Sequence, residues 1–296
     1  MKTRSIIYLL IFALALALGH ILQKIVLNHG VDRFVFGFLR IASGFVVITL
    51  LLIFRKYRPV SVIKKNIRHF IVLGVCFSGF GILMKLWGLS MTTATNAAFI
   101  MSLSSMTAVF FAFLLLKEKA RKRFYFIVAA MTGGVYLVTT GGEYLLPRLG
   151  DLIILALAFL IGFMQVYGKK VLNTLSVLEV SFGRSLIGTL FLGMMVLIFA
   201  PAGFGTIPNF PVLLLVLANG LTFSGGIIFF YMALQAEGAS NAAVFALLVP
   251  VLTALLGNLL LGEVLNSLQV LGGVVILSGS FLISRLKFRQ PAGSNP

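Results

Sequence analysis

Apolar runs of about 20 residues recur along the whole chain, and they constrain its fold more than any other feature. Each run is long enough to cross a lipid bilayer as an α-helix, and short polar gaps separate the runs. Hydrophobic residues make up 60% of the 296 positions and charged residues only 10%, which excludes an ordinary soluble domain. Because the runs are continuous rather than alternating, we expect an all-α polytopic membrane protein and not a β-barrel.

The run lengths predict ten transmembrane helices joined by short loops, which leaves no segment for a soluble domain. The first run is too long for the core of a signal peptide and lacks a convincing cleavage site, so we interpret it as a spanning helix. The expected spans are residues 5–27, 34–54, 70–90, 94–116, 124–141, 150–170, 178–200, 211–235, 240–261 and 267–285.

Positive charge is distributed unevenly between the two ends of these helices. The formal net charge is +17, but the charges concentrate in the gaps between apolar runs, which argues against a nucleic-acid-binding protein. With the N-terminus placed inside, 18 of the 24 Lys and Arg residues fall on that side of the membrane. This asymmetry predicts a multi-pass protein of the cell membrane with both termini in the cytoplasm.

Two long segments of the chain repeat each other. "TNAAFIMSLSSMTAVFFAFLLLKE", which starts at Thr95, and "SNAAVFALLVPVLTALLGNLLLGE", which starts at Ser240, share N-A-A near the start and L-L-L-x-E at the end. Their offset is 145 residues, and the same offset aligns "KIVLN" at Lys24 with "KKVLN" at Lys169. Motifs that keep one order and spacing indicate an internal duplication.

The duplication divides the chain into residues 1–143 and 144–296, each with five expected helices. Five is an odd number, so the second half would enter the membrane with the opposite orientation. Inverted repeats of this kind are the architecture of many secondary transporters, which bind the solute near the midplane between the halves. A duplicated scaffold or channel without a transport cycle is the competing interpretation.

The segment "SNAAVFALLVPVLTALLGNLLLGEVLNSLQVLGGVVILSGSFLI" resembles the end of an EamA-type repeat of the drug/metabolite transporter superfamily. The resemblance covers essentially the whole chain. It implies a cytoplasmic-membrane transporter, commonly an exporter of amino acids or other small metabolites. It also implies that helices 1–4 and 6–9 surround a central cavity, while helices 5 and 10 pack at the periphery. A lysine in helix 3, such as Lys85, is unusual for this family.

All seven acidic residues fall in loops or at helix ends, so no spanning segment offers a buried carboxylate for ion coupling. Coupling would then depend on His20 or Lys85, or the protein is a uniporter or exchanger, which we favour. His20 lies deep in the first helix with Gln23 on a nearby face, and it could titrate or hydrogen-bond a solute. The alternative is a histidine whose hydrogen bonds are satisfied by a neighbouring helix.

Lys85 lies in "GILMKLWGLSM", inside an apolar run with no acidic residue nearby. It is about five residues from the outer end of its helix, so its ammonium group could reach the membrane surface. At the 145 offset it aligns with Phe230, which indicates that the fold does not require a lysine there. Our hypothesis is that Lys85 faces the outer part of the cavity and helps to select a solute with a negative group.

Further residues are candidates for cavity contacts or for helix hinges. Arg40 and Arg184 align at an offset of 144, and we interpret both as anchors whose long stems reach an interface. Trp87, Gln165, Tyr167 and Tyr231 are candidate cavity contacts, each with a packing role as the alternative. Asn96 and Asn241 are candidates that we also expect to cap their helices. Gly81, Gly225, Gly226 and Pro250 are expected to interrupt or hinge helices, with close helix packing through small residues as the equal alternative.

The leading hypothesis is therefore a secondary transporter for small metabolites, exporting or exchanging amino acids, related amphiphiles or organic anions. An enzyme is disfavoured because one cysteine and three scattered histidines form no catalytic or metal-binding pattern. We expect no cofactor and no metal. The expected partners are a small-molecule solute and the lipid bilayer, not nucleic acid, and two copies could associate as a homodimer.

Overall fold

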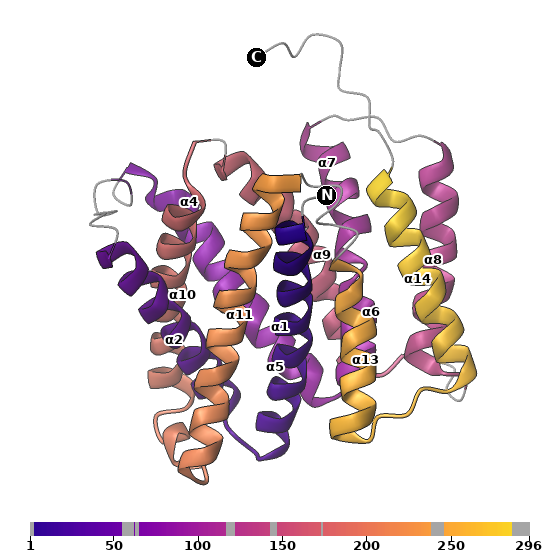
Figure 1. Cartoon of the computed structure of the whole chain (residues 1–296). Coiled ribbons are helices and arrows are strands. Elements are labelled where there is room, and N and C mark those ends of the chain that lie inside the picture. Colours follow the sequence, from indigo (N-terminus) through magenta and orange to yellow (C-terminus); the bar gives the residue numbers. More distant parts are fainter. Residues whose placement is uncertain are drawn as a thin grey trace.

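The computed structural model describes residues 3–54, 62, 65–116, 122–142, 147–172, 174–237 and 246–285, and these form a bundle of helices (Figure 1). Apart from the span expected at 240–261, whose first residues lie outside the described part of the chain, the bounds agree with the expected spans to within a few residues. Long apolar runs and the polar gaps between them define both. The helices of the first half are α1 (Thr3–Asn28), α2 (Arg33–Phe54), α4 (Ile67–Ile71), the π-helix η1 (Val72–Gly81), α5 (Ile82–Ser90), α6 (Ala94–Met101), α7 (Ser104–Leu116) and α8 (Lys122–Thr140).

The second half contains fewer and longer helical segments. They are α9 (Leu149–Leu172), α10 (Val177–Phe199), the short 3-10 helix η2 (Gly203–Thr206), α11 (Phe210–Glu237), α13 (Leu248–Leu261) and α14 (Ser267–Arg285). Within the described residues, seven spans are long and apolar enough to cross a membrane, and three further apolar helices, at 210–226, 248–261 and 267–283, are shorter. The number of ten spans therefore stays a prediction.

Breaks within the helices differ from those expected. The span expected at 94–116 is divided into α6 and α7 at Ser102 and Leu103. At the 145 offset Ser102 corresponds to Leu247, which lies in a turn directly before α13. Pro250 lies in the first turn of α13, a position that proline tolerates. Ser102 and Leu247 thus lie in turns at equivalent positions of the two halves.

The helix breaks expected at glycines are only partly present. Gly81 ends η1, so the helical hydrogen-bonding pattern changes there although the backbone stays helical. The interruption expected at Gly225 and Gly226 is wrong, because α11 runs through both. Gly226 instead faces α1, where an added Cβ would lie 3.3 Å from the Cβ of Ala15. Its small size serves close packing of the two helices.

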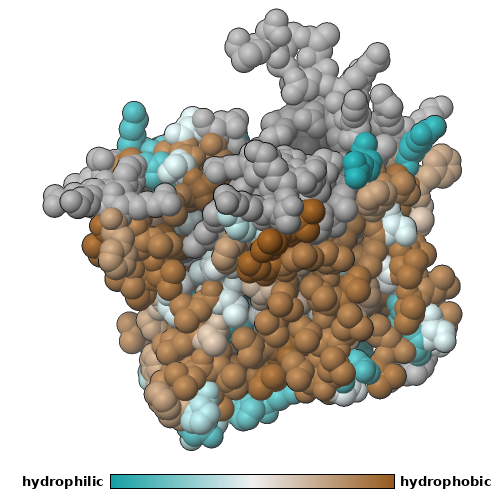
Figure 2. All heavy atoms as spheres, in the orientation of Figure 1, coloured by the Kyte–Doolittle hydropathy of each residue, from teal (hydrophilic) through white to brown (hydrophobic). Residues whose placement is uncertain are grey.

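The helices form one layered bundle whose surface is apolar around its middle. α8 and α14 pack against each other at one edge, which matches the peripheral place expected for helices 5 and 10 (Figure 1). The start of α1 and the end of α14 lie at the same end of the bundle. Figure 2 shows a broad hydrophobic band between hydrophilic ends, as a bilayer requires.

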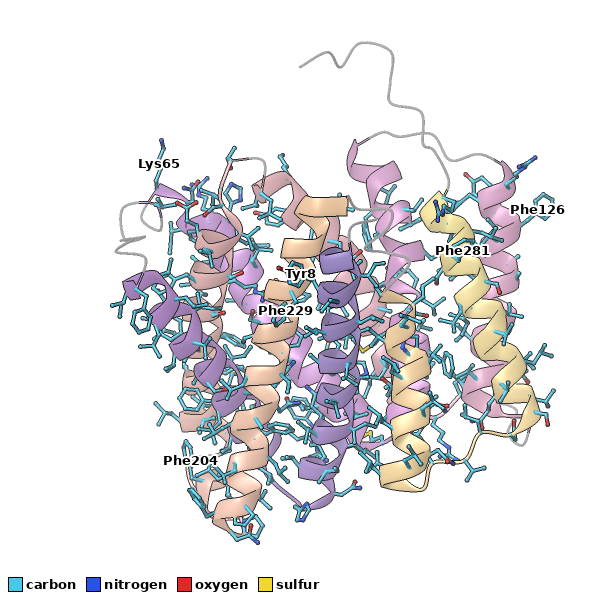
Figure 3. The ribbon with its side chains drawn as sticks, in the orientation of Figure 1. Tyr8, Lys65, Phe126, Phe204, Phe229 and Phe281 are labelled. Carbon is cyan, nitrogen blue, oxygen red and sulfur yellow. The ribbon has the colours of Figure 1, made fainter. Side chains whose placement is uncertain are left out.

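Contacts across the bundle pair helices of one half with helices of the other. α1 packs against α11 and α13, and the equivalent α9 packs against α5, η1, α6 and α7. Figure 3 shows Tyr8 of α1 and Phe229 of α11 pointing toward each other, with ring centroids 6.0 Å apart. α2 packs on α11, and its equivalent α10 packs on η1. The core therefore lies between the two halves.

Candidate functional site

Two arginines, one from each half, stack on phenylalanine rings inside the bundle. The guanidinium carbon of Arg40 on α2 lies 4.4 Å from the centre of the Phe223 ring on α11. That of Arg184 on α10 lies 4.9 Å from the centre of the Phe77 ring in η1. The arginines differ by 144 residues and the phenylalanines by 146, so the two cation–π pairs are equivalents in the two halves.

Glycine contacts around these pairs repeat in the same way. Gly220 of α11 lies directly against Ser43 of α2, and Gly74 of η1 lies directly against Ile187 of α10. The residue numbers of equivalent positions again differ by 144 between α2 and α10, and by 146 between η1 and α11. A third matched pair is formed by Gly44 with Ser224 and by Gly188 with Ser78. Small residues at these crossings allow the helix backbones to approach closely, which fixes where the arginines lie.

Both arginine side chains extend toward the middle of the bundle rather than toward its ends. α2 and α11 start at the same end, because the backbone N–H of Asp32 donates to Thr206 Oγ1 at 2.8 Å just before them. Gly220 lies at the level of the Arg40 backbone, because an added Cβ there would meet the Arg40 carbonyl oxygen. Phe223 is three residues further along α11, so its ring lies roughly 4.5 Å deeper in the bundle than the Arg40 backbone. With only 2% of its surface exposed, Arg40 is not the interface anchor that the sequence indicated.

A cavity lies between α2, α10 and α11 at these arginines. Its free volume, measured as space open to the centres of water molecules, is about 30 Å³. Arg40, Arg184 and three serine hydroxyl groups provide its polar lining, and aliphatic and aromatic side chains provide the rest. The lining residues are Arg40, Ile41, Gly44, Ile48, Val177, Leu178, Ser181, Arg184, Ser185, Phe223 and Ser224. Among these described residues there is no acidic side chain.

Lys85 and His20 are further buried basic residues that interact with Arg40, and we define His20, Arg40, Lys85 and Arg184 as the basic cluster. Lys85 is 7% exposed and His20 is 6% exposed. The charge of Arg40 acts on both His20 and Lys85. Arg40 and Arg184 lie close enough to repel each other. Lys85 is buried near the cavity but is not among the residues that line it.

Gln23 forms part of a polar link between α1 and α11. Its Nε2 donates to Asn219 Oδ1 at 3.3 Å, and Asn219 Nδ2 donates to the carbonyl oxygen of Gly19 at 2.7 Å. Both amide side chains are fully buried. This arrangement ties the two halves together one turn away from His20, whose Nδ1 has no hydrogen-bond partner among the described residues.

Trp87 and Tyr167 belong to aromatic groups outside the cavity. Trp87 packs edge-on against Phe34, with ring centroids 5.1 Å apart, near the start of α2. The hydroxyl of Tyr167 lies 2.7 Å from His69 Nδ1. Neither residue lines the cavity. Both interact with other side chains of the bundle, as the packing alternative expects.

The other candidates lie apart from the cavity or outside the described part of the chain. Gln165 is exposed on α9. Asn96 is not the cap of its helix, because Thr93 Oγ1 accepts its backbone N–H at 3.0 Å, and the Asn96 side chain instead faces Gln269 of α14. Asn241 and the side chain of Tyr231 lie outside the described residues.

A carboxylate of the second half binds the start of a helix of the first half. Glu263 Oε1 accepts the backbone N–H of Ala94 at 2.7 Å, and Oε2 accepts the N–H and the hydroxyl of Thr95 at 2.9 and 2.7 Å. From its place just before α14, Glu263 is expected to complement the dipole of that helix, but Asn266 caps α14 instead. We call this contact the Glu263 latch.

Lys24 makes a second link at the same end of the bundle. Its Nζ donates to the carbonyl oxygens of Leu89 and Thr92, at 2.8 and 2.5 Å, at the end of α5. The ammonium group therefore binds free carbonyls at a helix C-terminus instead of only reaching a membrane surface. Together with the Glu263 latch, it joins α1, α5, α6 and the α13–α14 connection.

Sequence reasoning placed the emphasis on Lys85 and His20 and missed the cavity itself. Its serines, Ser181, Ser185 and Ser224, carry no sequence signal because serine is common in spanning helices. Arg40 and Arg184 did carry a signal, since they recur at equivalent positions in both halves. Their recurrence within apolar spans, where charge is costly, was the observation that could have identified them.

Comparison with known proteins agrees with this geometry. The EamA-like transporter family matches twice, at residues 3–140 and 148–285. An uncharacterized transporter of Methanothermobacter thermautotrophicus is 28% identical over 209 residues, which is 68% of this chain and only 60% of that protein. The riboflavin transporter ImpX of Fusobacterium nucleatum is 27% identical over 232 residues, covering 73% of this chain and 74% of that protein.

Two further matches support the same assignment. The uncharacterized transporter YyaM of Bacillus subtilis is 26% identical over 240 residues, covering 79% of this chain and 78% of that protein. A protein crystal structure with 19% identity has a similar fold, with a TM-score of 0.63 over 94% of this chain and 96% of that one. The two family matches together account for most of the sequence. The chain belongs to the EamA-like transporter family.

Proposed function

We propose that this protein is a secondary transporter that moves small metabolites across the cytoplasmic membrane by alternating access, as an exporter or exchanger. The observation that carries the proposal is the matched set of contacts between α2 and α11 and between α10 and η1. Inverted repeats produce such pairs, because each half packs against the other with the same residues in opposite orientation. We therefore propose ten spans in two five-helix repeats, residues 1–143 and 144–296, with both termini cytoplasmic.

Alternating access requires that the halves separate at one end while they close at the other. The Glu263 latch joins the two halves at the end that we assign to the outside, and the bonds from Lys24 hold α1 to the end of α5 beside it. These contacts close the outer end in the state described here. The transport cycle must break them, and the solute must supply enough differential binding energy to do so.

The solute class follows from the family and from the cavity. We propose a small amphiphilic metabolite, either an amino acid or a related organic anion, because the cavity combines cationic and hydroxyl groups with apolar walls. A relative is named as a riboflavin transporter, which adds aromatic ring systems to the candidates. The spanning segments contain no acidic residue in their middle, which favours exchange or uniport over carboxylate-based ion coupling.

A thermal-shift screen of the purified protein tests this proposal first. The panel comprises amino acids, organic acids, riboflavin and cationic drugs, and a ligand is identified by a concentration-dependent rise in Tm. Uptake of that ligand into proteoliposomes should then saturate with concentration, as a carrier requires. Flux that rises linearly without saturation would contradict a carrier and support a channel.

A further inference from the structure

The cavity between α2, α10 and α11 gathers hydrogen-bond donors from all three of these helices. Arg40 and Arg184 are paired across it, and the hydroxyl groups of Ser181, Ser185 and Ser224 complete the polar lining. Guanidinium groups donate in a planar fork that matches carboxylate and phosphate oxygens. Hydroxyl groups donate to the same oxygens. The lining therefore offers a ligand many donors and no carboxylate acceptor.

Arg40 is the strongest sign that this lining is incomplete without a ligand. Its side chain is 2% exposed, and its Nε and Nη1 atoms have no hydrogen-bond partner among the described residues. A buried cation without a counter-ion is costly inside a membrane protein. The ring of Phe223 compensates only in part, because a cation–π contact is weaker than a paired, hydrogen-bonded charge.

The surrounding charges increase this cost. Arg184 lines the same cavity and repels Arg40, and the charge of Arg40 also acts on Lys85. The acidic residue that lies near the start of α10, Glu179, accepts the N–H of Ser176 at 2.7 Å in a capping box and does not line the cavity. The basic cluster therefore produces a positive potential in a low-dielectric region that attracts anions.

We propose that the cavity binds the carboxylate or phosphate group of an amphipathic anionic solute, with Arg40 and Arg184 as its paired ligands. This inference rests on the proposed transport function and names the substrate class. The serine hydroxyls complete the coordination of the anionic head. The cavity of about 30 Å³ has room for the anionic head alone, so the apolar part of the solute is accommodated beside Ile41 and Ile48 only once the halves separate. Lys85 does not line the cavity and acts on the site only through its electrostatic interaction with Arg40.

The repeat relation gives the arginine pair a role in the transport cycle. Arg40 lies on α2 of one half and Arg184 on the equivalent helix α10 of the other, and each extends toward the midplane. An anion held between them is therefore contacted equally by both halves. When the halves exchange conformations, one arginine remains with the solute as the other opens to the exit side. This is the behaviour that alternating access requires of a central site.

Binding of matched ligands to the wild-type protein tests the site without any substitution. The probes are phenylacetate and phenyl phosphate, with phenylacetamide as a neutral compound of the same shape as phenylacetate. Isothermal titration in detergent should give saturable binding of at least one of the anions and much weaker binding of the amide. Equal binding of phenylacetate and phenylacetamide, or binding of the amide alone, would overturn the proposal.

Three substitutions and one matched control locate the site. Arg40→Gln and Arg184→Gln should each weaken anion binding roughly 10- to 100-fold, the loss expected for a charged hydrogen-bonded partner. Arg40→Lys keeps the charge without the fork and should give an intermediate loss. Arg33→Gln is the control, because Arg33 is also on α2 but donates to Ser90 Oγ away from the cavity. Binding that falls only in Arg33→Gln would contradict the assignment.

Transport measurements separate failure of the site from failure of the function. If Arg40→Gln and Arg184→Gln transport the solute found in the screen with unchanged affinity, the anion site is wrong and the transporter stands. If the anions bind at the arginines but no solute shows saturable uptake, the site stands and the proposed function is wrong. Saturable anion uptake that both arginine substitutions abolish supports the two proposals together.

Discussion

Replacing the carboxylate of the Glu263 latch should shift the protein toward a state that is open at the outer end. Glu263 accepts three hydrogen bonds from Ala94 and Thr95, both completely buried, at the start of α6. In Glu263→Gln one oxygen becomes an amide nitrogen. This NH₂ group can donate to the Thr95 hydroxyl, but it faces the backbone N–H of Thr95 and leaves that donor unpaired.

The size of the effect follows from that one lost bond. An unpaired buried N–H that had bonded to a charged group costs about 2 kcal/mol. The loss applies only while the outer end is closed, since water satisfies the same N–H when the latch opens. The ratio of open to closed protein should therefore rise roughly 30-fold.

Spin-label distance measurements read this ratio directly. Cys76 is the only cysteine, so a Cys76→Ser background allows labels at Met91 and Leu260, which are 44% and 57% exposed near the outer ends of α5 and α13. Glu263→Gln should add a population with a longer distance between the labels. An unchanged distance distribution in correctly folded Glu263→Gln protein would refute the latch.

Asp32→Asn provides a control with the same chemistry. Asp32 Oδ1 accepts the N–H groups of Phe34 and Val35, at 2.9 and 3.1 Å, at the start of its own helix α2. The substitution removes a carboxylate from a helix N-terminus without touching a bond between the halves. It should lower Tm slightly and leave the distances between the labels unchanged.

Four other substitutions test the packing and the charges. Gly220→Ala should prevent folding or lower Tm strongly, because its Cβ would overlap the backbone oxygen of Arg40. Gly225→Ala on the same helix should keep or raise Tm, because its Cβ meets no atom within 4 Å. Lys24→Gln should lower stability by about 2 kcal/mol in chemical denaturation, because two carbonyls at the end of α5 lose a charged donor. Lys85→Met should raise Tm, because it removes a buried charge that has no hydrogen-bond partner among the described residues, and it should weaken phenylacetate binding several-fold. A Lys85→Met protein that binds phenylacetate as the wild type does would limit Lys85 to a structural role.

Hydropathy predicted the spans well because the bilayer imposes their length on the sequence. α10, for example, was expected at 178–200 and is found at Val177–Phe199. The duplication was also readable, since "SNAAV" and "TNAAF" keep the same spacing to an acidic residue. The break at Ser102 was missed because neither glycine nor proline marks it. It depends on tertiary contacts, including the Ser280 hydroxyl that donates to the Ser102 carbonyl oxygen at 3.3 Å.

The candidate site was harder to predict because it depends on which residues meet across the bundle. Glu263 appeared to serve the helix that follows it in sequence, but its partners are 169 and 168 residues away in α6. Arg40 appeared close enough to a helix end to reach the interface, but packing at Gly220 directs it inward over Phe223. Sequence spacing gives the depth of a side chain in the membrane, whereas its direction depends on the neighbouring helix.

Counterflow in proteoliposomes tests the central claim of alternating access most directly. Vesicles that contain the wild-type protein are loaded with unlabelled solute from the thermal-shift screen and placed in labelled solute. Alternating access predicts that the internal solute accelerates entry of the label, with a transient overshoot above the equilibrium level. Label entry that is independent of internal solute and proportional to its external concentration would contradict the account.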